Sequence, residues 1–354
     1  MTNKLYTEDF IDKNGCRWNL NVYNCKDEDY YRAIYYNKLV ISVCVSLLDS
    51  ILIIYRVGIK RRNIITLYGI ASIDGLLVFV GLFAYAMIYH AISILKAEEV
   101  GNYVLQEFSF YMQYIFVLIA IQIYLTGTLN ASPRYKSSAF YYPRPRVANT
   151  ISFIFMIIWV SIEIVGIFKI GSIRNFPYIS YEKSIYQFDE ALKNSQYKLW
   201  VKITYVTFGV ASVITCILFI LFGVNLHKTA KRSLEEMYRT KKIKSNVVVP
   251  IRIALYKMEW INGACYVFMF VFGVLFIIMG FFENLVYSYE RTVFPKIFCV
   301  ALNIIPPAII FMTLLSIVYG EARSDIISIF PSTHCEDDDY QMNYTKQSNE
   351  GEKI

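Results

Sequence analysis

Among the carboxylic acids in long apolar stretches of the sequence, three are candidates for a function, namely Asp49, Asp74 and Glu163. An ionisable side chain deep in a membrane helix costs at least about 2.5 kcal/mol unless it is paired or hydrated. Each acid could therefore belong to a functional site between helices. A structural hydrogen bond to a neighbouring helix would account equally well for any one of them.

A candidate ligand-binding set lies in the halves of these stretches that the topology below places outside the cell. A pocket between helices needs a few convergent polar groups in an apolar cavity. An interfacial aromatic belt would explain the tryptophan of the set as well. The candidates are His90, Gln113, Glu163, Trp200, Lys202 and Lys296.

The sequence has few residues that could serve an intramembrane metal enzyme or a retinal protein. The chain has 3 histidines, and His227 and His334 fall outside the apolar stretches, whereas an intramembrane zinc hydrolase needs several histidine or carboxylate ligands. A retinal Schiff base would need a lysine in the middle of the last stretch, but Lys296 is only about one turn from its outer end. We therefore expect no enzyme, no metal site and no cofactor.

The elements that position these residues are seven apolar stretches, each long enough for a bilayer, which takes about 20 mostly apolar residues. Only 18% of the 354 residues are charged, against roughly 25% in soluble domains, so little chain is left for a soluble core. The predicted fold is an all-α membrane protein with a seven-transmembrane helix bundle. The predicted spans are Ile34–Tyr55, Ile64–Leu95, Tyr103–Leu129, Ala148–Ile170, Leu199–Leu226, Ile261–Phe282 and Val293–Tyr319.

Lysine and arginine in the short loops predict the orientation. The first, third and fifth loops are strongly basic, whereas acids and bases nearly balance in the others. This places the N-terminus outside and the C-terminus in the cytoplasm of a multi-pass protein, which we expect in the plasma membrane. The same distribution explains the net charge of +7 without a nucleic-acid partner. The deciding residues of the first and third loops are Arg56, Lys60, Arg61, Arg62, Arg134, Lys136, Arg144 and Arg146.

The chain divides into an extracellular tail (1–33), the bundle (34–319), an amphipathic juxtamembrane helix (320–331) and a disordered cytoplasmic tail (332–354). Pro331 is expected to end the amphipathic helix. Cys16 and Cys25 share the outer tail and could form a local disulfide on the oxidising side of the membrane. Two free or differently paired thiols remain the alternative.

This architecture resembles that of a G-protein-coupled receptor, over Ile34 to Phe330. The local motif is Asn63 followed by Ala71-Ser72-Ile73-Asp74-Gly75-Leu76-Leu77, which is similar to the Leu-Ala-x-x-Asp-Leu-Leu pattern of rhodopsin-like receptors. The seventh span departs from their Asn-Pro-x-x-Tyr pattern, with Asn303-Ile304-Ile305-Pro306-Pro307. The resemblance implies a divergent receptor that senses an unknown extracellular ligand.

The resemblance also implies a heterotrimeric G protein as the cytoplasmic partner. Its candidate contact is the basic run Arg239, Lys241, Lys242 and Lys244, between the fifth and sixth spans. The same run could bind anionic membrane lipid or serve only as a topology signal.

A polar switch is a further expectation from the resembled fold, in which the first, second and seventh helices are neighbours. Asp49, Asp74 and Asn303 could then converge and hold a sodium ion or a shared proton. Pro306 and Pro307 would weaken the helix beside Asn303, because neither has a backbone donor. A static hydrogen-bond network is the alternative.

A membrane transporter or channel for a small solute is the alternative function. Such proteins show polar pathways or discontinuous helices, and the Pro306-Pro307 pair is the feature that fits. No internal repeat supports that alternative.

The predicted orientation can be tested with a protease added to intact cells. Cleavage is expected between Met1 and Tyr30 and not between Lys228 and Lys244, because the membrane shields the cytoplasmic loop. Permeabilised cells serve as the control. Cleavage of the basic loop in intact cells would overturn the orientation.

Overall fold

The computed structural model describes residues 18–19, 22–23, 27–61, 64–66, 69–96, 103–131, 144–174, 195–239, 245–282, 286 and 293–323. Within them, seven helical segments are long and apolar enough to cross a membrane, which confirms the predicted number. The first is α2 (Glu28–Ile53) with its continuation η1 (Ile54–Ile59), and the seventh is divided into α10 (Val293–Asn303) and α11 (Ile305–Arg323). The other five are α3 (Ser72–Leu95), α4 (Tyr103–Ala131), α5 (Pro145–Arg174), α7 (Ser195–Arg239) and α8 (Ser245–Phe281).

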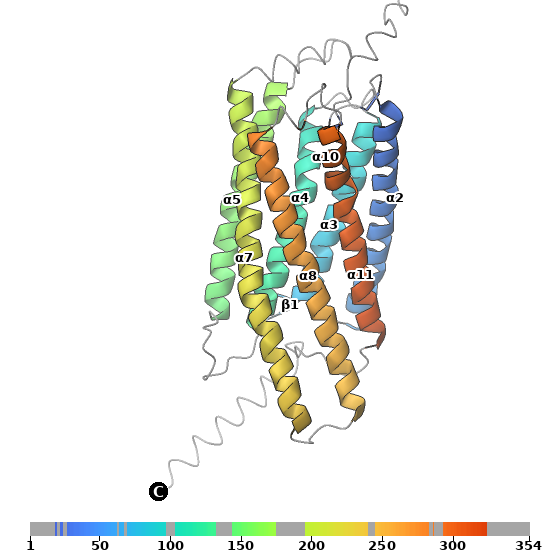
Figure 1. Ribbon diagram of the computed structural model, residues 1–354, viewed down its shortest axis with the longest axis vertical. Helices are drawn as coiled ribbons and strands as arrows, with labels where there is room; N and C mark the ends of the chain where they lie inside the picture. Colours follow the sequence, from blue (N-terminus) through green and yellow to red (C-terminus); the bar gives the residue numbers. More distant parts are fainter. Residues whose placement is uncertain are drawn as a thin grey trace, which may run out of the picture.

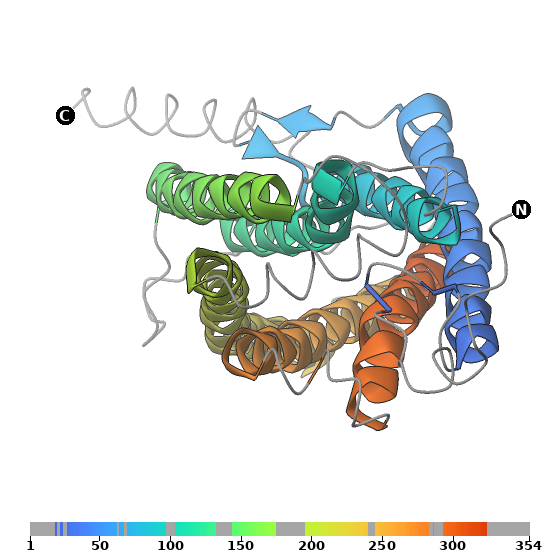
Figure 2. The ribbon, with the colours of Figure 1, turned by 90° about the horizontal axis from the view of Figure 1, so that it is seen from above.

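The helices form a closed ring in chain order (Figures 1 and 2). Each span packs against the next, and α11 and α10 return to α2. α4 also contacts α7, and its apolar window is the most buried of the seven. The first and seventh spans are therefore neighbours, as the predicted bundle requires.

Four predicted helix boundaries differ clearly from the structure, including the end of the fifth helix, at Arg239 instead of Leu226, and the start of the sixth, at Ser245 instead of Ile261. The first helix begins at Glu28 instead of Ile34, so it includes polar residues that we assigned to the outer tail. The second begins at Ser72 instead of Ile64, because β1 (Ile65–Thr66) and β2 (Gly69–Ile70) pair as a short antiparallel hairpin before it. Of the predicted amphipathic helix, residues 320–323 belong to α11, and 324–354 lie outside the described residues.

The fifth and sixth spans are much longer than a bilayer requires. α7 has 45 residues and α8 has 37, whereas about 20 suffice to cross the hydrocarbon core. Both run past the ends of the other helices at the same end of the bundle (Figure 1). The end of α7 at Arg239 and the start of α8 at Ser245 therefore lie beyond the bundle (Figure 1).

The seventh span is interrupted beside its two prolines. α10 ends at Asn303, Ile304 forms a turn, and α11 begins at Ile305. Pro306 has no N–H to donate to the carbonyl of Leu302, four residues earlier. The hydroxyl of Tyr114, a fully buried residue of α4, donates to that carbonyl at 2.7 Å. The central helix therefore satisfies a backbone group that the proline leaves free.

An aromatic core surrounds the Tyr114 hydroxyl bond. The Tyr114 ring lies 4.8 Å from Phe276 and 6.2 Å from Phe208, between ring centroids, and both phenylalanines are buried. Phe208 and Phe276 also contact each other, at 4.5 Å. α4, α7, α8 and the interruption of the seventh span are thus packed together at one level.

The Tyr114 bond can be tested by Tyr114→Phe, which leaves the Leu302 carbonyl buried without its donor. We expect the free energy of unfolding to fall by about 1–3 kcal/mol. In a Pro306→Ala background the restored N–H can serve Leu302, so the same substitution should cost clearly less. Thermal unfolding of the four proteins in detergent measures this coupling.

Tyr31→Phe is the matched control, because Tyr31 is also buried but no hydrogen bond of its hydroxyl to a described residue is seen. An equal loss from Tyr114→Phe in both backgrounds would show that the hydroxyl does not compensate for Pro306.

Candidate functional site

A buried lysine meets three neutral polar side chains inside the bundle. The Lys38 ammonium of α2 lies 2.6 Å from His90 Nδ1 of α3, and it donates to Gln113 Oε1 of α4 at 3.1 Å and to Asn303 Oδ1 of α10 at 2.9 Å. All four residues are fully buried. Because an ammonium has three donors and no lone pair, these contacts use all its hydrogens. We call these four residues the Lys38 cluster.

Aromatic residues cover the Lys38 cluster toward the N-terminal segment. The ammonium lies 5.6 Å from the centroid of the Tyr35 ring, and the Tyr35 hydroxyl donates to the carbonyl of Trp18 at 2.7 Å. Phe110 contacts both the Trp18 ring, at 6.4 Å, and the His90 ring, at 5.4 Å. Trp18 and Tyr35 are completely buried, so water has no direct path to the ammonium on this side.

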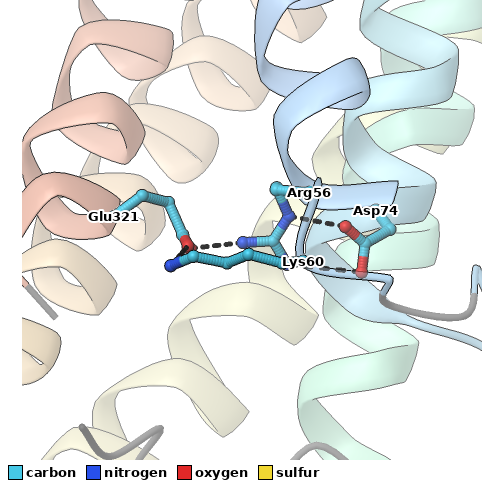
Figure 3. A network of polar contacts seen from close by, with 4 residues as sticks. All are labelled: Arg56, Lys60, Asp74 and Glu321. Atoms are coloured by element: carbon cyan, nitrogen blue, oxygen red, sulfur yellow. Dashed lines mark hydrogen bonds and ion pairs between the residues drawn. The ribbon is translucent and has the colours of Figure 1, made fainter. Parts of the chain in front are cut away.

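A second polar group lies at the other end of the same helices (Figure 3). Arg56, in η1, binds Asp74 at the start of α3 through two contacts, Nε to Oδ1 at 2.6 Å and Nη2 to Oδ2 at 3.3 Å. Its Nη1 donates to Glu321 of α11, which also accepts from Lys60 at 3.2 Å. We call these four residues the Arg56 network. Its two cations and two carboxylates balance, and Arg56, Asp74 and Glu321 are buried.

Three spans contribute to both groups. The pairs are Lys38 with Arg56 on the first span, His90 with Asp74 on the second, and Asn303 with Glu321 on the seventh. At 1.5 Å per residue, the two groups lie about 24–27 Å apart along these helices, close to the thickness of the hydrocarbon core. The interruption of the seventh span lies immediately after Asn303.

The six candidate ligand-binding residues do not form one site. His90 and Gln113 belong to the Lys38 cluster. Lys296 forms an ion pair with Asp27 at 2.9 Å, and Lys202 lies exposed over the Phe281 ring at 4.5 Å.

The other two candidates lie on α5 and α7. Glu163 is completely buried on α5, one turn from Trp159, whose ring contacts Phe208 of α7 at 6.3 Å. Trp200 is half-buried, and its carbonyl accepts a hydrogen bond from Thr204.

The three residues of the expected switch have separate partners. Asp74 binds Arg56, and Asn303 accepts from Lys38 while its amide donates to the carbonyl of Cys299 at 2.9 Å. Asp49 is buried against α3, where a Cβ on Gly81 would lie 2.7 Å from Asp49 Oδ2, so a larger residue at position 81 would displace the carboxylate. The structure therefore shows a cationic partner for Asp74 and no shared carboxylate pair.

Lys38 was not among the residues that the sequence singled out. A lysine near the end of an apolar stretch usually extends its amine to the interface, so it gave no signal by itself. Its spacing from other polar residues could have identified it. Polar residues recur every three or four positions along one face of α2, and all are buried: Lys38, Ser42, Ser46 and Asp49. Arg56 continues this face but was interpreted only as a topology residue.

Some predicted residues cannot be placed. Lys241, Lys242 and Lys244 lie outside the described residues, as do Cys16 and Cys25. Arg239 is the last residue of α7. Within the described part of the chain, no three His, Cys, Asp or Glu residues are grouped as they would be around a metal ion.

An open groove of about 710 Å³ lies between α8 and α11. Glu259, Trp260 and Tyr266 line it from α8, and Ile309 and Met312 line it from α11. Trp260, Tyr266 and Met312 are each about 40–50% exposed on the outer surface of the bundle. The groove therefore faces the surroundings of the bundle and not the Lys38 cluster.

Comparison with known proteins gives no relative. No protein-family model matches the chain, and no match was found among curated proteins or solved structures. The functional argument therefore depends on the geometry of the two polar groups.

The Arg56 network can be tested by Asp74→Asn. The amide cannot neutralise the buried guanidinium, so we expect a loss of about 3–5 kcal/mol in the free energy of unfolding. Adding Arg56→Met should recover part of that loss, because the unpaired charge is removed. Thermal unfolding of the three proteins measures both effects.

Arg32→Met is the control, since it breaks the Arg32–Glu28 pair, whose side chains are 35% and 30% exposed. An exposed pair of this kind contributes at most about 1 kcal/mol. If Asp74→Asn costs no more than this control, the Arg56 network does not stabilise the bundle.

Proposed function

We propose that this protein is a receptor that transmits an extracellular signal to a cytoplasmic G protein. The observation that supports the proposal is that the first, second and seventh spans each contribute to both the Lys38 cluster and the Arg56 network. A change at one group can therefore reach the other through helix motion alone, without a chain of intermediate contacts.

The seventh span is the element whose geometry can differ between two states. α10 carries Asn303 in the Lys38 cluster, α11 carries Glu321 in the Arg56 network, and only Ile304 separates the two helices. A ligand that displaces Asn303 from Lys38 would change the angle between α10 and α11. Glu321 would then move away from Arg56, which would open the cytoplasmic ends of the first, second and seventh spans.

The partner surface in this proposal is the extension formed by α7 and α8. Both helices run beyond the bundle, and the basic run that includes Arg239 lies between them. A basic surface of this kind favours an acidic partner through long-range attraction. The orientation predicted from the loops places this surface in the cytoplasm, where a G protein is available.

A transporter of a small solute is the second candidate. The interruption of the seventh span beside a buried lysine favours it, because discontinuous helices commonly form transport sites. A transporter would move solute or current in reconstituted vesicles without a G protein, whereas the proposed receptor would not.

The proposal can be tested without knowing the ligand. Glu321→Gln removes one carboxylate from Arg56 and should favour the open state, so basal guanine-nucleotide exchange on a reconstituted G protein should rise roughly fivefold, as expected for about 1 kcal/mol. Replacing Arg239, Lys241, Lys242 and Lys244 by glutamate in the same protein should abolish the increase.

The matched control exchanges lysine for arginine and arginine for lysine at those four positions, which keeps the charge and should keep the exchange activity. The absence of stimulated exchange with every class of G protein would contradict the receptor proposal. Full activity of the charge-reversed variant would make the basic run a topology signal only.

A further inference from the structure

The Lys38 cluster has a positive charge but no negative one. Its three partners are an imidazole and two amides, and no ion pair between Lys38 and a described carboxylate is seen. The Arg56 network shows the contrast, because there each cation contacts a carboxylate. A buried and unbalanced ammonium is strongly unfavourable in a membrane protein unless something neutralises it.

The hydrogen-bond arrangement of the cluster indicates what is missing. Lys38 donates to Nδ1 of His90, so the neutral ring has its hydrogen on Nε2. That nitrogen is buried and has no hydrogen-bond partner among the residues that the structure describes. Likewise, Gln113 accepts from Lys38 through Oε1, and its buried Nε2 has no partner in the described part of the chain. Two donors without acceptors therefore lie on the very groups that touch the ammonium.

We propose that the Lys38 cluster binds a small monovalent anion, either chloride or the carboxylate of a small organic ligand. The anion accepts hydrogen bonds from His90 Nε2 and Gln113 Nε2 and neutralises Lys38. This inference names the ligand chemistry of the proposed receptor and rests on that proposal for its role in signalling. The binding itself depends only on the cluster.

The aromatic cover limits the size of the anion. Tyr35, Trp18 and Phe110 enclose the cluster on one side, and all three are buried. Their rings suit a ligand whose remaining part is absent or apolar. A large hydrophilic anion such as gluconate would have to bury its hydroxyl groups against these aromatic rings, so it can serve as the inert counter-ion in a binding test.

The test is thermal unfolding of the purified full-length protein in detergent, without a G protein. Gluconate is replaced by chloride in one arm and by propionate in the other, at constant ionic strength. We expect the Tm to rise with concentration to a plateau about 3–8 °C higher in the arm that contains the bound anion. A rise with chloride alone identifies the halide, and a rise with propionate identifies a carboxylate.

Gln113→Glu is the decisive variant. It places a carboxylate of nearly the same shape beside Lys38, so the protein should remain folded and its Tm should no longer depend on the anion. Lys38→Met should also lose the dependence by removing the charge. Lys202→Met, at an exposed position, is the matched control and should keep the full response of the original protein.

The outcomes separate the two proposals. A Tm that does not respond to either anion, or a response that persists in Gln113→Glu, overturns the anion site. Saturable binding that Gln113→Glu removes supports the site, whether or not the protein stimulates nucleotide exchange. Exchange activity that is insensitive to both anions, with no effect on Tm, would leave the receptor proposal standing and remove the anion from it.

Discussion

A charge or free backbone group inside a membrane-spanning bundle must find its partner within the protein, because the hydrocarbon surroundings offer none. This constraint accounts for the surroundings of Arg56 and Lys38. Arg56 is buried with two carboxylates from two other helices. Lys38 contacts three oxygen or nitrogen acceptors from three other helices. These polar contacts join the first, second and seventh spans at two levels of the bundle.

The same constraint explains how the seventh span tolerates Pro306, the first of its two adjacent prolines. Pro306 would leave the Leu302 carbonyl without a donor in the most enclosed part of the bundle, and Tyr114 supplies one from α4. The Tyr114 hydrogen bond thus fixes the seventh span at its interruption. The aromatic contacts of Tyr114 with Phe276 and Phe208 keep its hydroxyl in position. An interruption of this kind has a defined geometry, so it can separate two rigid helices that move relative to each other.

Much of this architecture can be predicted from the sequence, because long apolar stretches have few alternatives in a membrane protein. The seven spans and the weak point at Pro306 belong to that part. The partners of Arg56 could not be predicted, since they come from α3 and from α11, 265 residues farther along the chain. Lys38 was missed because a single lysine near the end of a span is ordinary, whereas its meaning depends on α3, α4 and α10. Pairings between distant segments are set by packing, which periodicity does not show.

The two polar groups differ in net charge. This difference indicates that the Lys38 cluster responds to a ligand and that the Arg56 network opposes movement of the helix ends. The Arg56 network is neutral overall, and separating Glu321 from Arg56 would break a buried ion pair, so the network favours one arrangement of the helix ends. The Lys38 cluster has one net positive charge, so its free energy changes strongly with whatever anion reaches it. Asn303 and Glu321 belong to the two halves of one interrupted span. The free energy of anion binding at the Lys38 cluster can therefore offset the cost of separating Glu321 from Arg56. If both polar groups were electrically neutral, the bundle would be stable, but binding of an anion would not shift it from one state to another.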